Sequence, residues 1–190
     1  MSQHPPMKKV LVPLAPGFEE IEAITVIDVL RRAGVEVVVA GTQPGPIEAS
    51  RRTRHLPDCT LDDVRATDFD MIVLPGGQPG TANLRQDARI KRIIEILQAN
   101  NRYVAAICAA PSVLSAYGVL QGRAATSHPS VRTEVAAGAR EFSDQRVVID
   151  GQIVTSQAAG TAMEFAFALV TILCGADKAA EVNRGVIARL

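Results

Sequence analysis

The stretch Tyr103-Val-Ala-Ala-Ile-Cys108-Ala-Ala-Pro111-Ser112 decides the fold class of this 190-residue sequence. It begins with an apolar run of the kind found in strands that are buried on both faces of a sheet. Small residues and then Pro111 follow, and proline is favoured in the first turn of a helix. The stretch therefore predicts a buried strand that turns sharply into a helix, with Cys108 at the turn.

Apolar strand-like runs and helical patterns alternate along the rest of the sequence, which predicts right-handed βαβ crossovers. We therefore expect an α/β fold, with a doubly wound, mostly parallel sheet and helices on both faces. Asp150-Gly151 separates two short apolar runs and indicates a hairpin, so one sheet edge is expected to be antiparallel. Strands are predicted at residues 9–14, 35–40, 71–74, 104–107, 124–127, 146–149 and 153–155. Helices are predicted at residues 19–33, 87–100, 112–117, 161–174 and 178–188.

Charge and composition exclude several classes of protein. The 20 Lys and Arg residues balance the 20 Asp and Glu residues, and 47% of the chain is hydrophobic, which is typical of a globular protein. Nucleic-acid binding is not indicated, because the only dense basic run is Arg51, Arg52 and Arg54, which we interpret as a solvated patch. At this length we expect one domain, residues 1–190.

Several features predict a cytoplasmic protein without a membrane segment. The apolar run at residues 10–15 is too short for the core of a signal peptide, and the stretch 158–174 contains a glutamate and is too short for a membrane span. The three cysteines, Cys59, Cys108 and Cys174, show no C-x-x-C spacing. We therefore expect neither a disulfide framework nor a metal site, and a reducing compartment.

Ligands of parallel α/β sheets bind where the strands end. Cys108 lies at such an end and has the setting of a nucleophile elbow, facing the positive end of the next helix. This position predicts a lowered thiol pKa, and the alternative is a small buried apolar residue. We interpret Cys174 as part of an apolar helix and Cys59 as an exposed thiol in a polar turn. The other residues that follow predicted strands are Pro16 to Glu20, Pro75 to Gly77, and His128 with Pro129.

Glu22 breaks the pattern of the first predicted helix. A projection at 100° per residue places it between Val29 and Ala33, on the apolar arc that should face the sheet. Burial would favour the neutral acid, which can donate a hydrogen bond or carry a proton. The alternative is a first-turn acid that tilts into water. Glu19 and Glu20 are explained by the favourable effect of negative charge at a helix N-terminus.

Two weaker candidates lie at the same sheet edge. His128 follows a predicted strand and is either catalytic or structural. The backbone amides of Gly76 and Gly77 are placed as in an oxyanion hole, and their alternative role is to form a turn. No phosphate-binding glycine motif or metal-ligand spacing is present in the sequence, so no cofactor is expected.

Together these motifs resemble the ThiJ/PfpI superfamily over nearly the whole chain. That resemblance implies a glutamine-amidotransferase-like, flavodoxin-like sandwich. The sequence is most similar to the Parkinson-disease-protein branch of protein deglycases or glyoxalase III-like proteins, in its bacterial type. The motifs that carry the resemblance are APGFEEIE (15–22), DVLRRAG (28–34), VLPGG (73–77), AAICAAP (105–111), SHP (127–129) and TSQAAGT (155–161).

The resemblance implies a role for each matching residue. Cys108 corresponds to the nucleophile, Glu22 to the glutamate that hydrogen-bonds it, and His128 to a nearby histidine. Peptidase-like members have a histidine where this chain has Ala109, so proteolysis is disfavoured. Family members are typically homodimers, and a homodimer is expected here. Oxyanion or substrate-binding positions are expected at Gly76, Gly77, Ala109 and Arg51.

Two functions follow from this resemblance. The first is a cofactor-independent enzyme whose cysteine acts on α-oxoaldehydes such as methylglyoxal and glyoxal, or on their early glycation adducts. The second is an oxidative-stress sensor or chaperone that works through selective oxidation of Cys108, with weak or no turnover. Both functions depend on the same cysteine.

Overall fold

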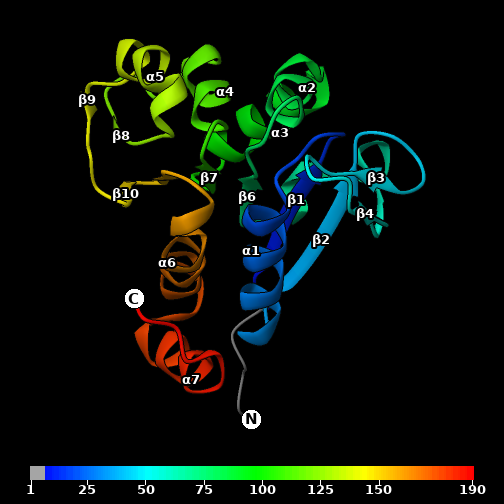
Figure 1. Cartoon of the computed structure of the whole chain (residues 1–190), viewed down its shortest axis with the longest axis vertical. Helices are drawn as coiled ribbons and strands as arrows, with labels where there is room; N and C mark the ends of the chain where they lie inside the picture. The colour runs from blue at the N-terminus through cyan, green and yellow to red at the C-terminus, as the bar shows by residue number, and fades with distance from the viewer. Residues whose placement is uncertain (1–6) are drawn as a thin grey trace.

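The computed structural model describes residues 7–190, so the first six residues of the expected 1–190 domain lie outside the described residues. A seven-stranded sheet forms its centre (Figure 1). Its strands are β1 (Lys9–Leu14), β2 (Glu36–Gly41), β5 (Cys59–Thr60), β6 (Met71–Leu74), β7 (Tyr103–Ile107), β10 (Val147–Asp150) and β11 (Ile153–Ser156). Their order is β10-β11-β7-β6-β1-β2-β5, and only the edge pair β10–β11 is antiparallel. The α/β fold and the hairpin at one sheet edge are confirmed.

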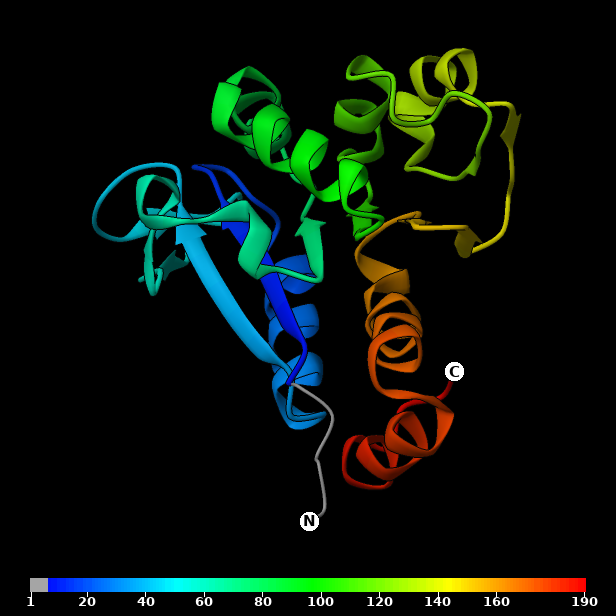
Figure 2. The ribbon, with the colours of Figure 1, turned by 180° about the vertical axis from the view of Figure 1, so that it is seen from behind.

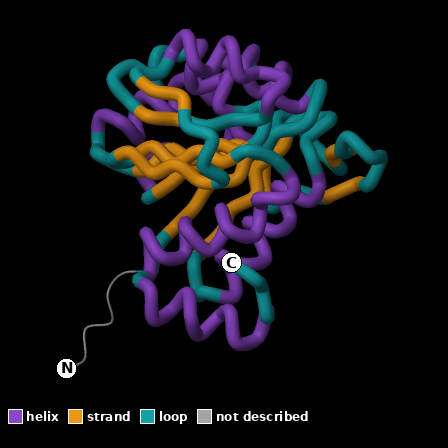
Figure 3. Tube along the Cα trace, turned by 60° about the vertical axis from the view of Figure 1, so that its left-hand side comes forward, coloured by secondary structure: helices purple, strands orange, loops and turns teal. Residues whose placement is uncertain are grey.

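Helices cover both faces of this sheet, as the view in Figure 3 shows. Along β1, Val10 and Val12 belong to one buried core cluster and Leu11 belongs to the other, because successive side chains of a strand point to opposite faces. The first cluster packs against α1 (Glu20–Arg32) and α6 (Ala162–Cys174), with α7 (Ala176–Val186) next to α6. The second packs against α3 (Ala88–Ala99) and α4 (Pro111–Ala116), accompanied by α2 (Gly80–Gln86) and α5 (Arg132–Gly138). Seen from behind, α7 lies beyond the end of α6 (Figure 2).

The strand order creates a switch point between β1 and β6. From β1 the chain continues to β2 on one side, and it later returns to β6 on the other side. Since β1, β6 and β7 are parallel neighbours, their carboxyl ends lie at one edge of the sheet. The segments that carry Glu22, Gly76 and Cys108 follow these three strands, and such a switch point is where α/β folds bind ligands.

Two sequence predictions about local structure are wrong. Residues 124–127 were predicted as a strand of the main sheet, but only β8 (Ala124–Ala125) forms, and it pairs with β9 (Glu141–Phe142) in a separate two-stranded sheet. The reason is that side chains replace the main-chain ladder: the N–H groups of Ala124 and Thr126 bond to the side chains of Asp150 and Thr155. Cys59, predicted in a polar turn, is a half-buried residue of β5, paired with β2.

Several short elements had no clear signal in the sequence. Helices α2 and α5 have seven residues each, too few for a periodic apolar pattern to be recognised. A small strand pair, β3 (Ile47–Glu48) with β4 (Arg54–His55), packs beside the start of α1. No helix in residues 7–190 is long and apolar enough to cross a membrane. The 3-10 turns lie at Leu61–Asp63, Ala66–Asp68, Pro129–Val131 and Ala159–Thr161.

Candidate active site

Cys108 occupies a tight corner between β7 and α4. Its φ angle is 66°, in the left-handed region that residues with a side chain rarely adopt. Two hydrogen bonds hold this conformation: the N–H of Cys108 donates to the Ser156 carbonyl at 2.9 Å, and the His128 N–H donates to the Cys108 carbonyl at 2.8 Å. The predicted sharp turn is therefore confirmed. A strained residue fixed from both sides is typical of a functional position.

Glu22 is buried directly beside this corner. Its side chain is 1% exposed, so the alternative in which it tilts into water is wrong. The Gly76 N–H donates a 2.8 Å hydrogen bond to Oε2 of Glu22, across 54 residues of sequence. The other oxygen, Oε1, is buried without a hydrogen-bond partner in the described part of the chain. One carboxylate oxygen is thus fixed and the other is available for a reacting group.

Gly76 makes the close approach of Glu22 and Cys108 possible. A Cβ atom added at Gly76 would lie 2.7 Å from the Cys108 Cβ and 2.7 Å from Oε2 of Glu22. No side chain fits in this space. At Gly77 the φ angle is 89°, and an added Cβ would lie 2.5 Å from the Glu19 nitrogen. Gly76 and Gly77 can therefore form the tight turn and also present their backbone N–H groups as hydrogen-bond donors.

The protonation of Glu22 and that of Cys108 are coupled. Burial raises the pKa of Glu22 to about 7, although the neighbouring Cys108 thiol and the Gly76 amide oppose this change. Burial and the nearby Glu22 carboxylate raise the pKa of the Cys108 thiol to about 12. The predicted lowering of the thiol pKa is wrong, because burial and the nearby Glu22 outweigh the backbone amides of Ala109 and Gly77. At neutral pH the thiol holds its proton beside a carboxylate that can accept it.

Two backbone amides act on the sulfur atom itself. The backbone amides of Gly77 and Ala109 lower the pKa of the Cys108 thiol, against the larger effect of burial. They stabilise negative charge on the sulfur, as oxyanion-hole amides do for oxygen. Among residues 7–190, no three His, Cys, Asp or Glu side chains gather as metal ligands. The described residues bring together a thiol, a carboxylate and backbone amides at this corner.

His128 borders the site mainly through its backbone. Besides the N–H bond to Cys108, its Nδ1 accepts a hydrogen bond from the Ser130 N–H at 3.2 Å and lies 2.8 Å from the Ser130 hydroxyl. Since Nδ1 is an acceptor, the neutral ring carries its proton on Nε2. The Nε2–H group of that ring is a hydrogen-bond donor.

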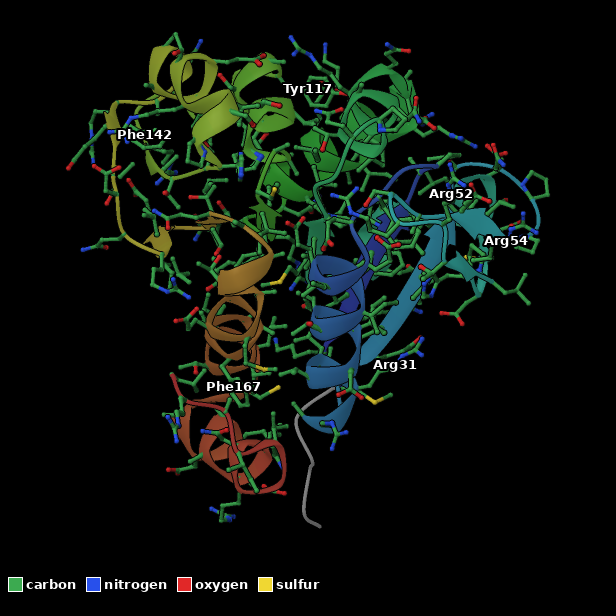
Figure 4. The ribbon with its side chains drawn as sticks, viewed as in Figure 1. Arg31, Arg52, Arg54, Tyr117, Phe142 and Phe167 are labelled. Atoms are coloured by element: carbon green, nitrogen blue, oxygen red, sulfur yellow. The ribbon has the colours of Figure 1, made fainter. Side chains whose placement is uncertain are left out.

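The structure does not bring Arg51 into contact with Cys108. Arg51 is exposed, its guanidinium donates to the Ser50 carbonyl at 3.4 Å, and its backbone N–H donates to Glu20 at 2.8 Å. Arg52 lies in the turn between β3 and β4 and Arg54 lies in β4, at the edge of the molecule (Figure 4). The interpretation of these arginines as a solvated patch agrees with their exposed positions.

Glu19 is the residue near the site whose contacts the sequence analysis missed. Its carboxylate accepts a 2.9 Å hydrogen bond from the Glu22 N–H, so Glu19 is the N-cap of α1. The favourable effect of negative charge at a helix N-terminus explains only part of the role of Glu19, because its carboxylate also caps the helix through a hydrogen bond. The three-residue spacing between Glu19 and Glu22 is a capping spacing and could have indicated the contact.

A sequence profile described as the DJ-1/PfpI family matches residues 8–172. The Parkinson disease protein 7 homolog of Danio rerio is 38% identical over 95% of this chain and 97% of its own length. The glutathione-independent glyoxalase DJR-1.2 of Caenorhabditis elegans is 37% identical over 90% of this chain and 91% of its own length. These relatives are animal proteins and do not support the bacterial type that the resemblance suggested.

The crystal structure of Drosophila melanogaster DJ-1beta is similar in fold as well as in sequence. It superposes with a TM-score of 0.93 at 40% identity and covers 97% of this chain and 100% of its own chain. The similarity thus extends over the seven-stranded sheet and its flanking helices.

Proposed function

The chain belongs to the DJ-1/PfpI family, in its DJ-1/Parkinson disease protein 7 branch, and we propose that it is a cysteine-dependent enzyme acting on α-oxoaldehydes. Its substrates would be methylglyoxal, glyoxal or their early glycation adducts, and its product from methylglyoxal would be lactate. No cofactor is needed for this reaction. Support comes from the relative named a glutathione-independent glyoxalase, which is 37% identical.

The observation that carries the proposal is the buried carboxylate next to a thiol. The pKa of Glu22 is raised to about 7, so near neutral pH this group can both accept and donate a proton. Its partner is a nucleophile whose thiol pKa is lowered by the backbone amides of Gly77 and Ala109, against the larger effect of burial. An isomerisation that moves a proton between adjacent carbons needs this combination of a nucleophile and a proton carrier.

In the first step, Glu22 accepts the Cys108 proton while the sulfur attacks the aldehyde carbon of methylglyoxal. A carbon–sulfur bond forms, and the π electrons of the carbonyl move to its oxygen. Glu22 then gives the proton to that oxygen, and a hemithioacetal results. The amides of Gly77 and Ala109 stabilise the sulfur as it loses its proton.

In the second step, Glu22 moves a proton between the two substrate carbons. It accepts the hydrogen of the former aldehyde carbon as a proton and delivers it to the neighbouring ketone carbon. The hydroxyl proton passes to the former ketone oxygen, and we assign His128 the role of assisting this transfer. The product is a thioester on Cys108. Water then cleaves the carbon–sulfur bond, which releases lactate and returns a proton to the sulfur.

The test is lactate formation from methylglyoxal by the wild-type protein and by Cys108→Ser. We expect lactate from the wild type and a loss of at least about a hundredfold in kcat/KM in the variant. Equal rates would rule out the mechanism. The oxidative-stress alternative is distinguished by intact mass after graded peroxide: oxidation at Cys108 before any other residue, without lactate formation, would favour the sensor.

We also propose that the protein is a cytoplasmic homodimer. A reducing compartment keeps the thiols Cys59, Cys108 and Cys174 available, and the structure contains them as free cysteines. On α1, Ile21 and Ile24 are 55% and 37% exposed, although they are large apolar residues. The same face of a second copy would cover them, because a two-fold dimer buries one patch against itself.

A further inference from the structure

Three hydrogen bonds form a closed ring at the start of α1. The Glu19 N–H donates to the Gly76 carbonyl at 2.9 Å. The Gly76 N–H donates to Oε2 of Glu22 at 2.8 Å, and the Glu22 N–H donates to Oε2 of Glu19 at 2.9 Å. Each of the three residues both gives and receives one bond. The ring joins the first turn of α1 to the glycine loop after β6.

We propose that Glu19 is a positioning residue, which holds the carboxylate of Glu22 against Cys108 and favours the protonated form of Glu22. This inference rests on the proposed function, since it assigns Glu19 a role in that reaction. Glu19 does not touch the reacting atoms itself. It acts through Glu22, from one helical turn away.

The geometry supports the positioning role in two ways. As N-cap, the Glu19 carboxylate satisfies a backbone N–H that the helix leaves unpaired, and the N–H in question belongs to Glu22 itself. The Glu19 backbone also fixes Gly76, whose amide in turn fixes Oε2 of Glu22. Both the main chain and the side chain of Glu22 are therefore held by contacts that Glu19 makes.

The charges around Glu22 support the second part of the proposal. The negative charge of Glu19 raises the pKa of Glu22, in addition to the larger effect of burial. Two groups outside α1 face Glu22, the Cys108 thiol and the Gly76 amide, and both lower the pKa of Glu22. On α6, which packs against α1, Glu164 is paired with Arg146 at 2.8 Å instead. Glu19 is thus the charged group that opposes ionisation of Glu22.

The test compares Glu19→Gln, Glu19→Asp and Glu20→Gln. Glutamine keeps an acceptor oxygen for the Glu22 N–H but removes the charge, whereas aspartate keeps the charge. Glu20→Gln is the matched control: it removes one charge from the same helical turn, where Glu20 bonds to Ser50 and Thr53 instead of Glu22. The primary measurement is a 13C NMR titration of the Glu22 carboxyl, assigned by its loss in Glu22→Gln. This titration can be measured even if the protein does not turn over methylglyoxal.

We expect the Glu22 midpoint to fall by about one pH unit in Glu19→Gln, the size of effect that one neighbouring charge produces. It should stay near the wild-type value in Glu19→Asp and Glu20→Gln. The acid limb of kcat/KM for methylglyoxal should move with it. An unchanged Glu22 midpoint in Glu19→Gln would overturn the inference. A shifted midpoint in a protein that makes no lactate would support the role of Glu19 at Glu22 and refute the proposed function alone.

Discussion

The backbone N–H of Gly76 donates a 2.8 Å hydrogen bond to the buried carboxylate of Glu22. This bond connects the loop after β6 with a residue that lies on the inner side of α1. Because Gly76 has no side chain, Cys108 can occupy the adjacent space. The relationship explains why an acid can be buried here, and it brings together the three segments that follow β1, β6 and β7.

Glu22 should make the stability of the protein depend on pH. Its pKa is raised from an ordinary 4.5 to about 7 on folding, so the folded state binds the proton more tightly. The contribution of protonated Glu22 to the free energy of unfolding is complete below pH 4.5 and is lost as pH rises through about 7. The free energy of unfolding falls by up to about 3 kcal/mol over this range. Glu22→Gln should flatten this part of the curve. Denaturant unfolding of the wild type and of Glu22→Gln at a series of pH values measures how the free energy of unfolding depends on pH. Parallel curves for the two proteins would contradict the effect of burial on the pKa of Glu22.

Gly76→Ala should damage both folding and activity. The new Cβ would lie 2.7 Å from the Cys108 Cβ, so the corner must shift, which costs about 1–3 kcal/mol. We expect kcat/KM to fall at least about tenfold, because the nucleophile and its base lose their alignment. Gly185→Ala is the control: nothing lies within 4 Å of its Cβ, and alanine should stabilise α7 by about 1 kcal/mol. If Gly76→Ala kept the stability and the kcat/KM of the wild type, the packing argument would fail.

The dimer proposal can be tested with two isoleucines of similar exposure. Ile21 on α1 is 55% exposed and Ile149 on β10 is 53% exposed. We expect Ile21→Asp to shift the protein towards monomer, because a charge would be buried in the interface. Ile149→Asp should leave the mass unchanged. Sedimentation of the two variants and the wild type decides the matter: a monomeric wild type, or an Ile21→Asp dimer of undiminished stability, would refute this interface.

The central part of the fold could be predicted because its signals are local. The strands β1, β6 and β7 are short apolar runs with proline, glycine or cysteine shortly after their ends, and the strand-to-helix corner at Cys108 follows from its small neighbours. Burial of Glu22 followed from helical periodicity alone. The sequence signal for each of these features lies within one short stretch of the chain.

The features that could not be predicted depend on contacts between distant segments. Whether residues 124–127 join the main sheet is decided by the side chains of Asp150 and Thr155, which take the place of main-chain partners. The pKa of Cys108 depends on its burial and on the nearby Glu22 carboxylate, and the close approach of the two residues needs the missing side chain of Gly76. The assignment of residues 1–190 to one domain stays a prediction.

The most direct test of the account is a double-mutant cycle on Glu22 and Cys108. It measures kcat/KM for lactate formation from methylglyoxal in the wild type, Glu22→Gln, Cys108→Ser and the double variant. If the two residues act as one unit, removing the second costs little once the first is gone, and the double variant is about as slow as the slower single variant. Losses that multiply in the double variant would show that Glu22 and Cys108 act independently, and would contradict the account.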